Sequence, residues 1–236
     1  MTEFTTWRSL VTGDGISAIP DSVLNHMDMV WWMDDGEGDA LSDSIGSISG
    51  TLVGDWGTDI DSPTSKNTVT MFNGDPDRAY SDSRFWIGGE TVSVGIWVRL
   101  DSSAQNYPIM TADDSQGQSD GRHWGVISRP DDDEFNLVHD ASIFDADVGP
   151  HPYDQWIMLA YSADGNSASL RLYDDEQLID SNSGSESRTT GSFYLNIIGD
   201  PNLGRFIESD VSVVMAADSE VSGEVWDQIH NDTKPQ

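Results

Sequence analysis

Residues 91–100 read TVSVGIWVRL, and this alternation constrains the fold more than any other feature of the sequence. Every second residue from Val92 to Leu100 is aliphatic, whereas most residues between them are polar or small. A period of two over ten residues predicts an antiparallel β-strand that is buried on one face only. The chain is therefore expected to build a sheet that packs one face into a core.

Shorter apolar runs predict further strands at 68–72, 123–128, 134–138, 156–161, 193–198 and 210–215. Asp164-Gly165-Asn166 predicts a hairpin turn, and the residues around it favour a loop longer than two residues. Stretches rich in Gly, Asp, Ser and Pro predict loops at 101–121, 139–154, 181–191 and 199–208.

Helical periodicity is confined to the C-terminal end. In SEVSGEVWDQIHND, at 219–232, Val225 and Ile229 share one face of a predicted helix. Many short strands, turn clusters and one helix predict an all-β fold, a two-sheet antiparallel jelly-roll sandwich with a short C-terminal helix. The chain shows no linker and no internal repeat, so we expect one domain over 28–236 preceded by an N-terminal arm or docking extension at 1–27.

Two adjacent tryptophans, Trp31 and Trp32, precede an acid- and glycine-rich run at 34–39. Because neighbouring residues of a strand face opposite sides, one tryptophan is predicted to point into the core. The other is predicted to face the N-terminal arm or a neighbouring molecule. The acidic run is expected to be a solvated turn.

Charge is the unusual feature of the composition. The chain has 42 acidic residues against 11 basic ones, a formal net charge of −31, and Lys66 and Lys234 are its only lysines. At about 1 M salt the Debye length falls to roughly 3 Å, so repulsion among these carboxylates is largely screened. The bias runs along the whole chain and favours a protein adapted to a high-salt environment. With no basic patch, nucleic acid is not an expected partner.

The sequence lacks the residues and segments that cysteine-based sites, export signals and membrane spans require. Cysteine is absent, so disulfides and thiolate metal sites are ruled out. The N-terminal stretch has neither a basic region nor an apolar core typical of an export signal, and no apolar run is long enough to cross a bilayer. We therefore expect a protein without a recognisable export signal and without membrane insertion.

Five segments, in order, resemble concanavalin A-like, laminin G-like jelly-roll domains. They are VWWMDDGEGDALSDSIGSISGTLVGD, VTMFNGDPDRAY, TVSVGIWVRLDS, DQWIMLAYSADGNSASLRLYDDEQL and DVSVVMAADSEVSGEVWDQIHN. The resemblance covers roughly residues 28–231. It implies two antiparallel sheets packed face to face, often with an ion at one rim, and its members include lectins, glycosidases, adhesion modules and surface modules of virus particles.

Two kinds of binding site are candidates. The segment NGDPDR offers Asn73, Asp75 and Asp77 as oxygen ligands for Ca²⁺ or Mg²⁺, and MDDGEGD offers further acids at 34–39. In a chain of this charge, however, most loops resemble cation sites. For glycans, Trp86, Tyr107 and Tyr153 lie in or beside predicted loops, where aromatic rings can stack on sugars.

Catalysis is not expected. The glucanase branch of the family carries two catalytic carboxylates in an E-x-D-x-x-E strand. The nearest match is Glu208-Ser209-Asp210, but the third acid is replaced by Val213. The five histidines are scattered, and no nucleophile elbow or phosphate loop is present.

These features favour a non-enzymatic structural or surface protein of a virus particle that infects a halophilic host, such as a capsid turret, decoration or tail component. Such a protein would assemble in the host cytoplasm as a homo-oligomer with other virion proteins, using Phe4, Trp7 and Leu10 of the arm as contacts. Contact with host surface glycans would be a second role. The alternative is a carbohydrate-binding, lectin-like module of a halophilic cell, and the third reading is a degenerate hydrolase.

Overall fold

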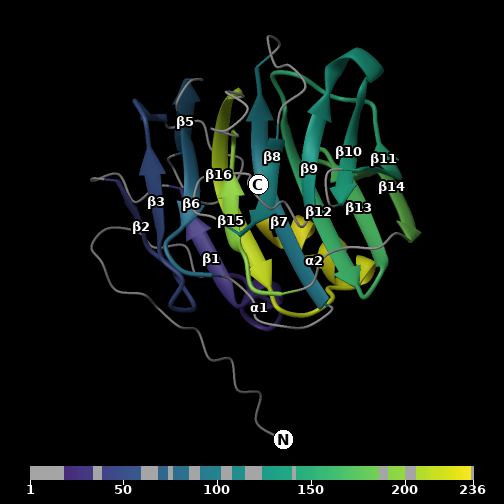
Figure 1. The fold of residues 1–236 in the computed structure, drawn as a ribbon, viewed down its shortest axis with the longest axis horizontal. Coiled ribbons are helices and arrows are strands. Elements are labelled where there is room, and N and C mark those ends of the chain that lie inside the picture. Colours follow the sequence, from purple (N-terminus) through teal and green to yellow (C-terminus); the bar gives the residue numbers. More distant parts are fainter. Residues whose placement is uncertain are drawn as a thin grey trace, which may run out of the picture.

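The computed structural model describes residues 19–33, 39–59, 69–73, 77–84, 91–101, 108–114, 124–139, 142–185, 191–199 and 206–234. Their strands form two sheets that stack as layers (Figure 1). Every pairing between described strands is antiparallel. The predicted fold class is confirmed.

Sheet A contains eight of the described strands. Its order is β14 (Leu178–Ser185), β13 (Ser167–Tyr173), β12 (Trp156–Asp164), β7 (Thr91–Leu100), β16 (Glu208–Ala217), β5 (Val69–Asn73) and β4 (Gly57–Asp59), with β1 (Met29–Trp32) also paired to β16.

Sheet B contains the other eight. Its order is β11 (Ser142–Val148), β10 (Glu134–His139), β9 (Trp124–Arg129), β8 (Pro108–Asp113), β15 (Tyr194–Ile197), β6 (Arg78–Ser81), β3 (Gly50–Val53) and β2 (Ala40–Leu41). The short helix α1 (Asp21–Leu24) precedes β1, the 3₁₀ turn η1 (Pro130–Asp132) lies between β9 and β10 in sequence, and α2 (Gly223–Thr233) follows β16.

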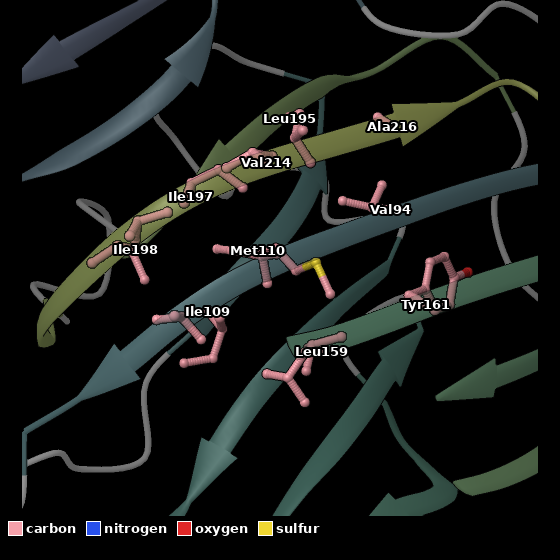
Figure 2. Close-up of a cluster of buried hydrophobic side chains, with 14 of the residues drawn as sticks. Val94, Ile109, Met110, Leu159, Tyr161, Leu195, Ile197, Ile198, Val214 and Ala216 are labelled. Atoms are coloured by element: carbon pink, nitrogen blue, oxygen red, sulfur yellow. The ribbon is translucent and has the colours of Figure 1, made fainter. Parts of the chain in front are cut away.

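The main core fills the space between the two sheets. Figure 2 shows part of it, where Val94, Leu159 and Val214 of sheet A share one layer with side chains of β8 and β15 in sheet B. The large aromatic residues of this core are Trp31, Phe72, Trp124, Phe135, Tyr161 and Phe193. Close packing of such rings fixes how the sheets sit on each other.

A second apolar cluster lies on the outer face of sheet A, where α2 packs. Trp97, Met158 and Val213 of the sheet are buried there together with Trp226 and Ile229 of the helix. A Cβ atom added at Gly95 would lie 2.7 Å from the Trp226 ring, so only glycine permits this close approach of helix to strand. Ser222 caps the helix, since its hydroxyl accepts a hydrogen bond from the Val225 amide at 3.4 Å.

Trp31 and Trp32 point in opposite directions, as predicted. Trp31 points into the main core, where its Nε1 donates to the Ile48 carbonyl at 2.7 Å. Trp32 points the other way, into the outer cluster, which also contains Ile19, Val23 and Met27 of the N-terminal segment. Residues 34–38 lie outside the described part of the chain.

Asp43 organises the loop that follows β2. One carboxylate oxygen accepts hydrogen bonds from the amides of Val30, Ile45 and Gly46, at 3.0–3.1 Å, and the other accepts from Ile48 at 3.0 Å. A carboxylate that receives four amide donors satisfies backbone groups and needs no cation to be stable. Asp43 therefore has a structural role.

Several expectations from the sequence were wrong. β7 is buried on both faces, because α2 covers the side that holds Ser93, Gly95 and Trp97. Residues 108–113 and 142–148, expected as loops, are strands β8 and β11, and the expected loop at 181–191 begins with five residues of β14. The turn after Asp164 has only two residues, since Asp164 pairs directly with Ser167.

Two of these errors have a clear physical cause. β8 opens with a proline and all six of its residues are buried, so no alternation of buried and exposed residues is visible. β11 is an edge strand with acids between its apolar residues, a pattern that protects sheet edges and also resembles a loop. Separately, no helix in the described part of the chain is long and apolar enough to span a membrane.

Candidate functional site

A hollow of about 340 Å³ opens at one end of sheet A. Its walls are Phe72 of β5, Arg99 and Asp101 at the end of β7, Asp154 before β12, and Glu208, Ser209 and Asp210 at the start of β16. This volume lies at the lower end of the range of roughly 300–1,000 Å³ that is usual for small-molecule sites. The hollow is thus large enough for a small ligand.

Strand register brings the lining residues together. Asp210 of β16 lies directly opposite Arg99 of β7, and Ser209 lies opposite Phe72 of β5. Beyond the end of β7, the Asp101 amide donates to the Glu208 carbonyl at 3.1 Å. The Asp154 amide donates to the Leu100 carbonyl at 2.9 Å, which ties the loop before β12 to the same point.

The backbone of Asp154 also shapes this end of the sheet. Its φ of 54° lies in the left-handed region, which aspartate tolerates better than most residues other than glycine. The side chain of Asp154 is exposed and lines the hollow.

The hollow has strongly acidic walls with one guanidinium group. Arg99 donates from Nε and Nη2 to one oxygen of Asp210, at 2.8 Å and 2.6 Å. Both side chains of this ion pair are mostly buried, with exposures of 23% and 18%. The guanidinium carbon also lies 5.2 Å from the centre of the Trp156 ring, a cation–π contact.

After Asp210 has neutralised Arg99, the carboxylates of Asp101, Asp154 and Glu208 leave the lining with a formal charge of −3. Carboxylates accept hydrogen bonds from hydroxyl or ammonium groups, and a guanidinium donates to oxygen atoms. The arrangement therefore suits a ligand rich in hydroxyl groups, with or without positive charge, and disfavours anions.

The cation site predicted at 73–77 lies mostly outside the described residues. Asn73 ends β5, but its side chain and all of Asp75 are not described. Asp77 is described and buried, and its Oδ1 accepts a hydrogen bond from the Asp55 amide at 2.6 Å. A Cβ at Gly54 would collide with this carboxylate, so Asp77 fits closely against the turn at 54–55.

No group of three or more His, Cys, Asp or Glu side chains in the described part of the chain can hold a metal ion. The calcium or magnesium site expected at Asn73, Asp75 and Asp77 stays a prediction.

Of the aromatic residues predicted to bind glycans, Trp86 and Tyr107 lie outside the described residues. Tyr153 is half-buried and packs against the main core, with its ring 4.4 Å from that of His151. It neighbours Asp154 in sequence but does not line the hollow. The predicted assembly contacts Phe4, Trp7 and Leu10 also lie outside the described residues.

The histidine beside Tyr153 forms a pair with a serine. The Ser128 hydroxyl lies 2.7 Å from Nε2 of His151, and the imidazole stacks on Phe135 at 4.2 Å. Both Ser128 and His151 are buried, which is unlike an accessible nucleophile and its base. Burial lowers the pKa of His151 to about 4, so the ring is neutral at pH 7.

Sequence reasoning singled out only one part of the hollow, Glu208-Ser209-Asp210, and did so as a near match to a hydrolase strand. The structure explains the missing third acid, because a bulge after Val211 turns Val213 into the apolar cluster under α2. Arg99 was missed. The sequence held no signal that distinguishes it, because Arg78, Arg129 and Arg171 also lie in strands.

No protein-family model matches the sequence, and no curated protein matches it significantly. Solved structures do resemble its fold. The receptor-binding domain of botulinum neurotoxin D has a TM-score of 0.64 at 10% identity, and the match covers 89% of this chain and 53% of that one. The receptor-binding domain of botulinum neurotoxin type G has a TM-score of 0.63 at 12% identity, covering 87% and 51%.

A sialidase of Trypanosoma rangeli, solved with 2,3-difluorosialic acid as a covalent intermediate, has a TM-score of 0.63 at 13% identity, with 91% of this chain and 34% of that chain covered. The chain thus spans about half the length of the toxin domains and a third of the sialidase. At such identities the likeness concerns the fold alone. The chain has a concanavalin A-like jelly-roll fold, like that found in these receptor-binding and sialidase proteins.

Proposed function

We propose that the protein is a non-enzymatic carbohydrate-binding module whose ligand enters the hollow between β7 and β16. The observation that carries this proposal is the lining of that hollow, where three carboxylates share the cavity with a guanidinium held by Asp210 and Trp156. Sugar hydroxyls both donate and accept hydrogen bonds, so they match carboxylates and a guanidinium together.

The charge of the hollow narrows the class of glycan. Neutral sugars and amino sugars suit an acidic lining, whereas sialic acids, uronic acids and sulfated sugars bring a second negative charge close to the first. Molar salt weakens this repulsion but does not remove it inside a partly enclosed site. The expected ligands therefore differ from the sialic acid analogue bound by the trypanosomal sialidase.

A binding role is favoured over hydrolysis by the state of Asp210. Two contacts from Arg99 occupy one oxygen of this carboxylate, so it is poorly suited to donate a proton to a leaving group. The strand pattern of the glucanase branch is also incomplete, because Val213 stands where its third acid would be.

The virion role expected from the sequence is the setting that we propose for this module. It rests on the salt-adapted composition and on the N-terminal arm, of which residues 1–18 lie outside the described structure. The fold supports the alternative reading, a carbohydrate-binding module, more directly. Co-migration of the protein with intact particles from an infected high-salt culture would test the setting independently of sugar binding.

The test of glycan binding is a panel of neutral, amino and anionic glycans in molar salt, followed by calorimetry on those that bind. Two isosteric variants neutralise the hollow, Glu208→Gln and Asp154→Asn, and asparagine also tolerates the left-handed backbone at 154. Each should weaken binding by about tenfold, because a charged acceptor becomes a neutral one. Glu220→Gln, at an exposed position away from the hollow, is the matched control.

Binding that is equal in all four proteins would place the ligand elsewhere, and a complete lack of glycan binding would overturn the proposed function. Release of reducing sugar by the wild type, lost in Glu208→Gln, would establish an enzyme instead.

A further inference from the structure

One side of the sandwich is formed by an edge strand of each sheet. Among the described strands, β14 is the last of sheet A and β11 the last of sheet B, and the two lie next to each other (Figure 1). The edge of a sheet presents amide and carbonyl groups that no neighbouring strand satisfies, so it can pair with a strand of another chain. What satisfies these groups decides whether this side can take part in assembly.

The sequence of β14, LIDSNSGS, carries little of the usual edge protection. It contains no lysine and no proline, and Asp180 is its only charged residue. The fully exposed residues of this strand are serines. At about 1 M salt the Debye length is roughly 3 Å, so the net charge of −31 does not hold two such edges apart. An edge of this kind is open to strand pairing unless its backbone groups are satisfied locally.

The strand register identifies the amides of β14 that point away from its neighbour β13. The residue pair that closes the two-residue turn between β12 and β13 exchanges hydrogen bonds, and the bonding direction alternates from there along β13. Leu170 and Leu172 therefore direct their backbone groups toward β14. The residues opposite them fill this ladder, so the amides of Ser181 and Ser183 point away from the sheet.

Two side chains of β14 satisfy these outward amides. The Ser181 amide donates to Asp180 Oδ1 at 2.8 Å, and the Ser183 amide donates to Asn182 Oδ1 at 2.8 Å. An amide that already has an acceptor gains little from a second strand, because its present hydrogen bond must first be broken. Two successive outward positions of the edge are thus capped, each by the residue before it.

The same two side chains also bind the edge of sheet B. Asp180 Oδ2 accepts a hydrogen bond from the Gly149 amide at 3.1 Å, and Asn182 Nδ2 donates to the Asp147 carbonyl at 3.2 Å. Both side chains lie opposite core-facing leucines of β13, so they point toward the space between the sheets. Each of them therefore satisfies one backbone group on the edge of each sheet.

We propose that Asp180 and Asn182 close this side of the sandwich against strand pairing with a second copy of the chain. Polar side chains that point inward at a sheet edge prevent edge-to-edge association, because an incoming strand would have to break their hydrogen bonds. Short hydrogen bonds of this kind do not depend on long-range charge, so the protection persists in molar salt. Assembly of the native protein then uses another surface.

The test compares two double variants of the full chain in molar KCl. Asp180→Ala with Asn182→Ala removes both caps, whereas Ser181→Ala with Ser183→Ala truncates exposed side chains of the same strand and leaves the caps in place. Sedimentation velocity over a range of protein concentrations measures self-association. The first variant should associate about tenfold more tightly than the wild type, and the second should match the wild type.

Amide hydrogen exchange locates the contact. At a protein concentration too low for association, the amides of residues 181 and 183 should exchange about tenfold faster in the first variant than in the wild type, and association should protect them again. Circular dichroism checks that each variant is folded. If the double truncation prevents folding, Asn182→Ala alone carries the test, with Ser183→Ala as its control.

Self-association of the first variant that equals that of the wild type would overturn the proposal. An equal increase in both double variants would also overturn it, since the loss of side chains rather than of caps would then be responsible. So would association that leaves the amides of residues 181 and 183 unprotected, because the contact would lie elsewhere. None of the substituted residues lines the hollow, so these results are independent of glycan binding.

Discussion

The outer face of sheet A carries two arginine–aspartate pairs, one under helix α2 and one beside the open hollow. Under the helix, Arg171 Nη2 donates to Asp227 at 2.8 Å, and Tyr173 donates to the same oxygen at 2.8 Å. At the open end, Arg99 donates twice to Asp210, and no described helix covers it. The same kind of ion pair thus fixes a helix in one place and lines a hollow in the other.

The difference lies in what surrounds each pair. The imidazole of His230 in α2 stacks on the Tyr173 ring, with 4.7 Å between the ring centres, and on the Trp97 ring, with 5.5 Å between them. Aromatic rings therefore pack between the helix and the sheet. Around Arg99 the neighbours are the Trp156 ring and the further carboxylates of the hollow. Burial does not separate the two pairs, since the Asp227 side chain is 48% exposed and that of Asp210 only 18%. The difference is the hollow, which gives a ligand access to the groups beside Arg99.

The largest effect is expected from Trp226→Ala at the covered end. This indole is buried in the outer cluster and donates from Nε1 to Ser162 at 2.8 Å. Its loss should lower the free energy of unfolding by about 3–5 kcal/mol, because a large cavity opens between helix and sheet. Denaturant titration measures this, and a loss below about 1 kcal/mol would mean that α2 contributes little to the fold.

Asp227→Asn should cost about 1–3 kcal/mol of unfolding free energy, because it weakens the acceptor shared by Arg171 and Tyr173. The same denaturant titration measures the loss. Asp232→Asn, at an exposed position on the same helix, is the control and should change stability little. A similar loss in both variants would show that helix charge, rather than the Arg171 pair, matters.

The free energy of unfolding should fall at acid pH, because two buried histidines resist protonation in the folded protein. Burial lowers the pKa of His151 to about 4 and also lowers the pKa of His230. The unfolded chain binds protons near pH 6.5, so stability falls as pH decreases below that value and continues to fall until the folded pKa is reached. Between pH 7.5 and 5.5 in molar salt, His151 alone should cost about 1.4 kcal/mol.

The control for that pH series is His151→Gln, which cannot charge and should show a shallower loss, as followed by unfolding at each pH. Neither histidine lines the hollow, so glycan affinity should change less than stability over this range. An equal pH slope in the variant would assign the effect to other groups.

Asp210→Asn should lower the free energy of unfolding by about 1–3 kcal/mol, because it weakens the acceptor of two Arg99 hydrogen bonds in a pair that is mostly buried. Glycan affinity should fall as well, since the guanidinium loses the partner that orients it. Asp227→Asn, away from the hollow, should leave glycan affinity unchanged. An equal loss of affinity in both variants would erase the distinction between the two pairs.

Much of the fold could be predicted from local patterns, and little of the site. Alternation identified β7, and the Asp-Gly turn identified the β12–β13 hairpin, because both signals arise from residues adjacent in sequence. β8 was missed because burial on two faces removes alternation. The hollow could not be predicted, since its lining comes from β5, β7, β16 and the loop before β12, whose proximity depends on strand register.

By itself, the sequence determined the all-β class, the C-terminal helix, the opposite directions of Trp31 and Trp32, and the acidic surface, because each depends on local periodicity or on composition. The tertiary structure alone decided that α2 covers part of the outer face of sheet A and that Arg99 meets Asp210. Those pairings join residues distant in the chain, and they follow from sheet register and core packing, which no short window of sequence encodes.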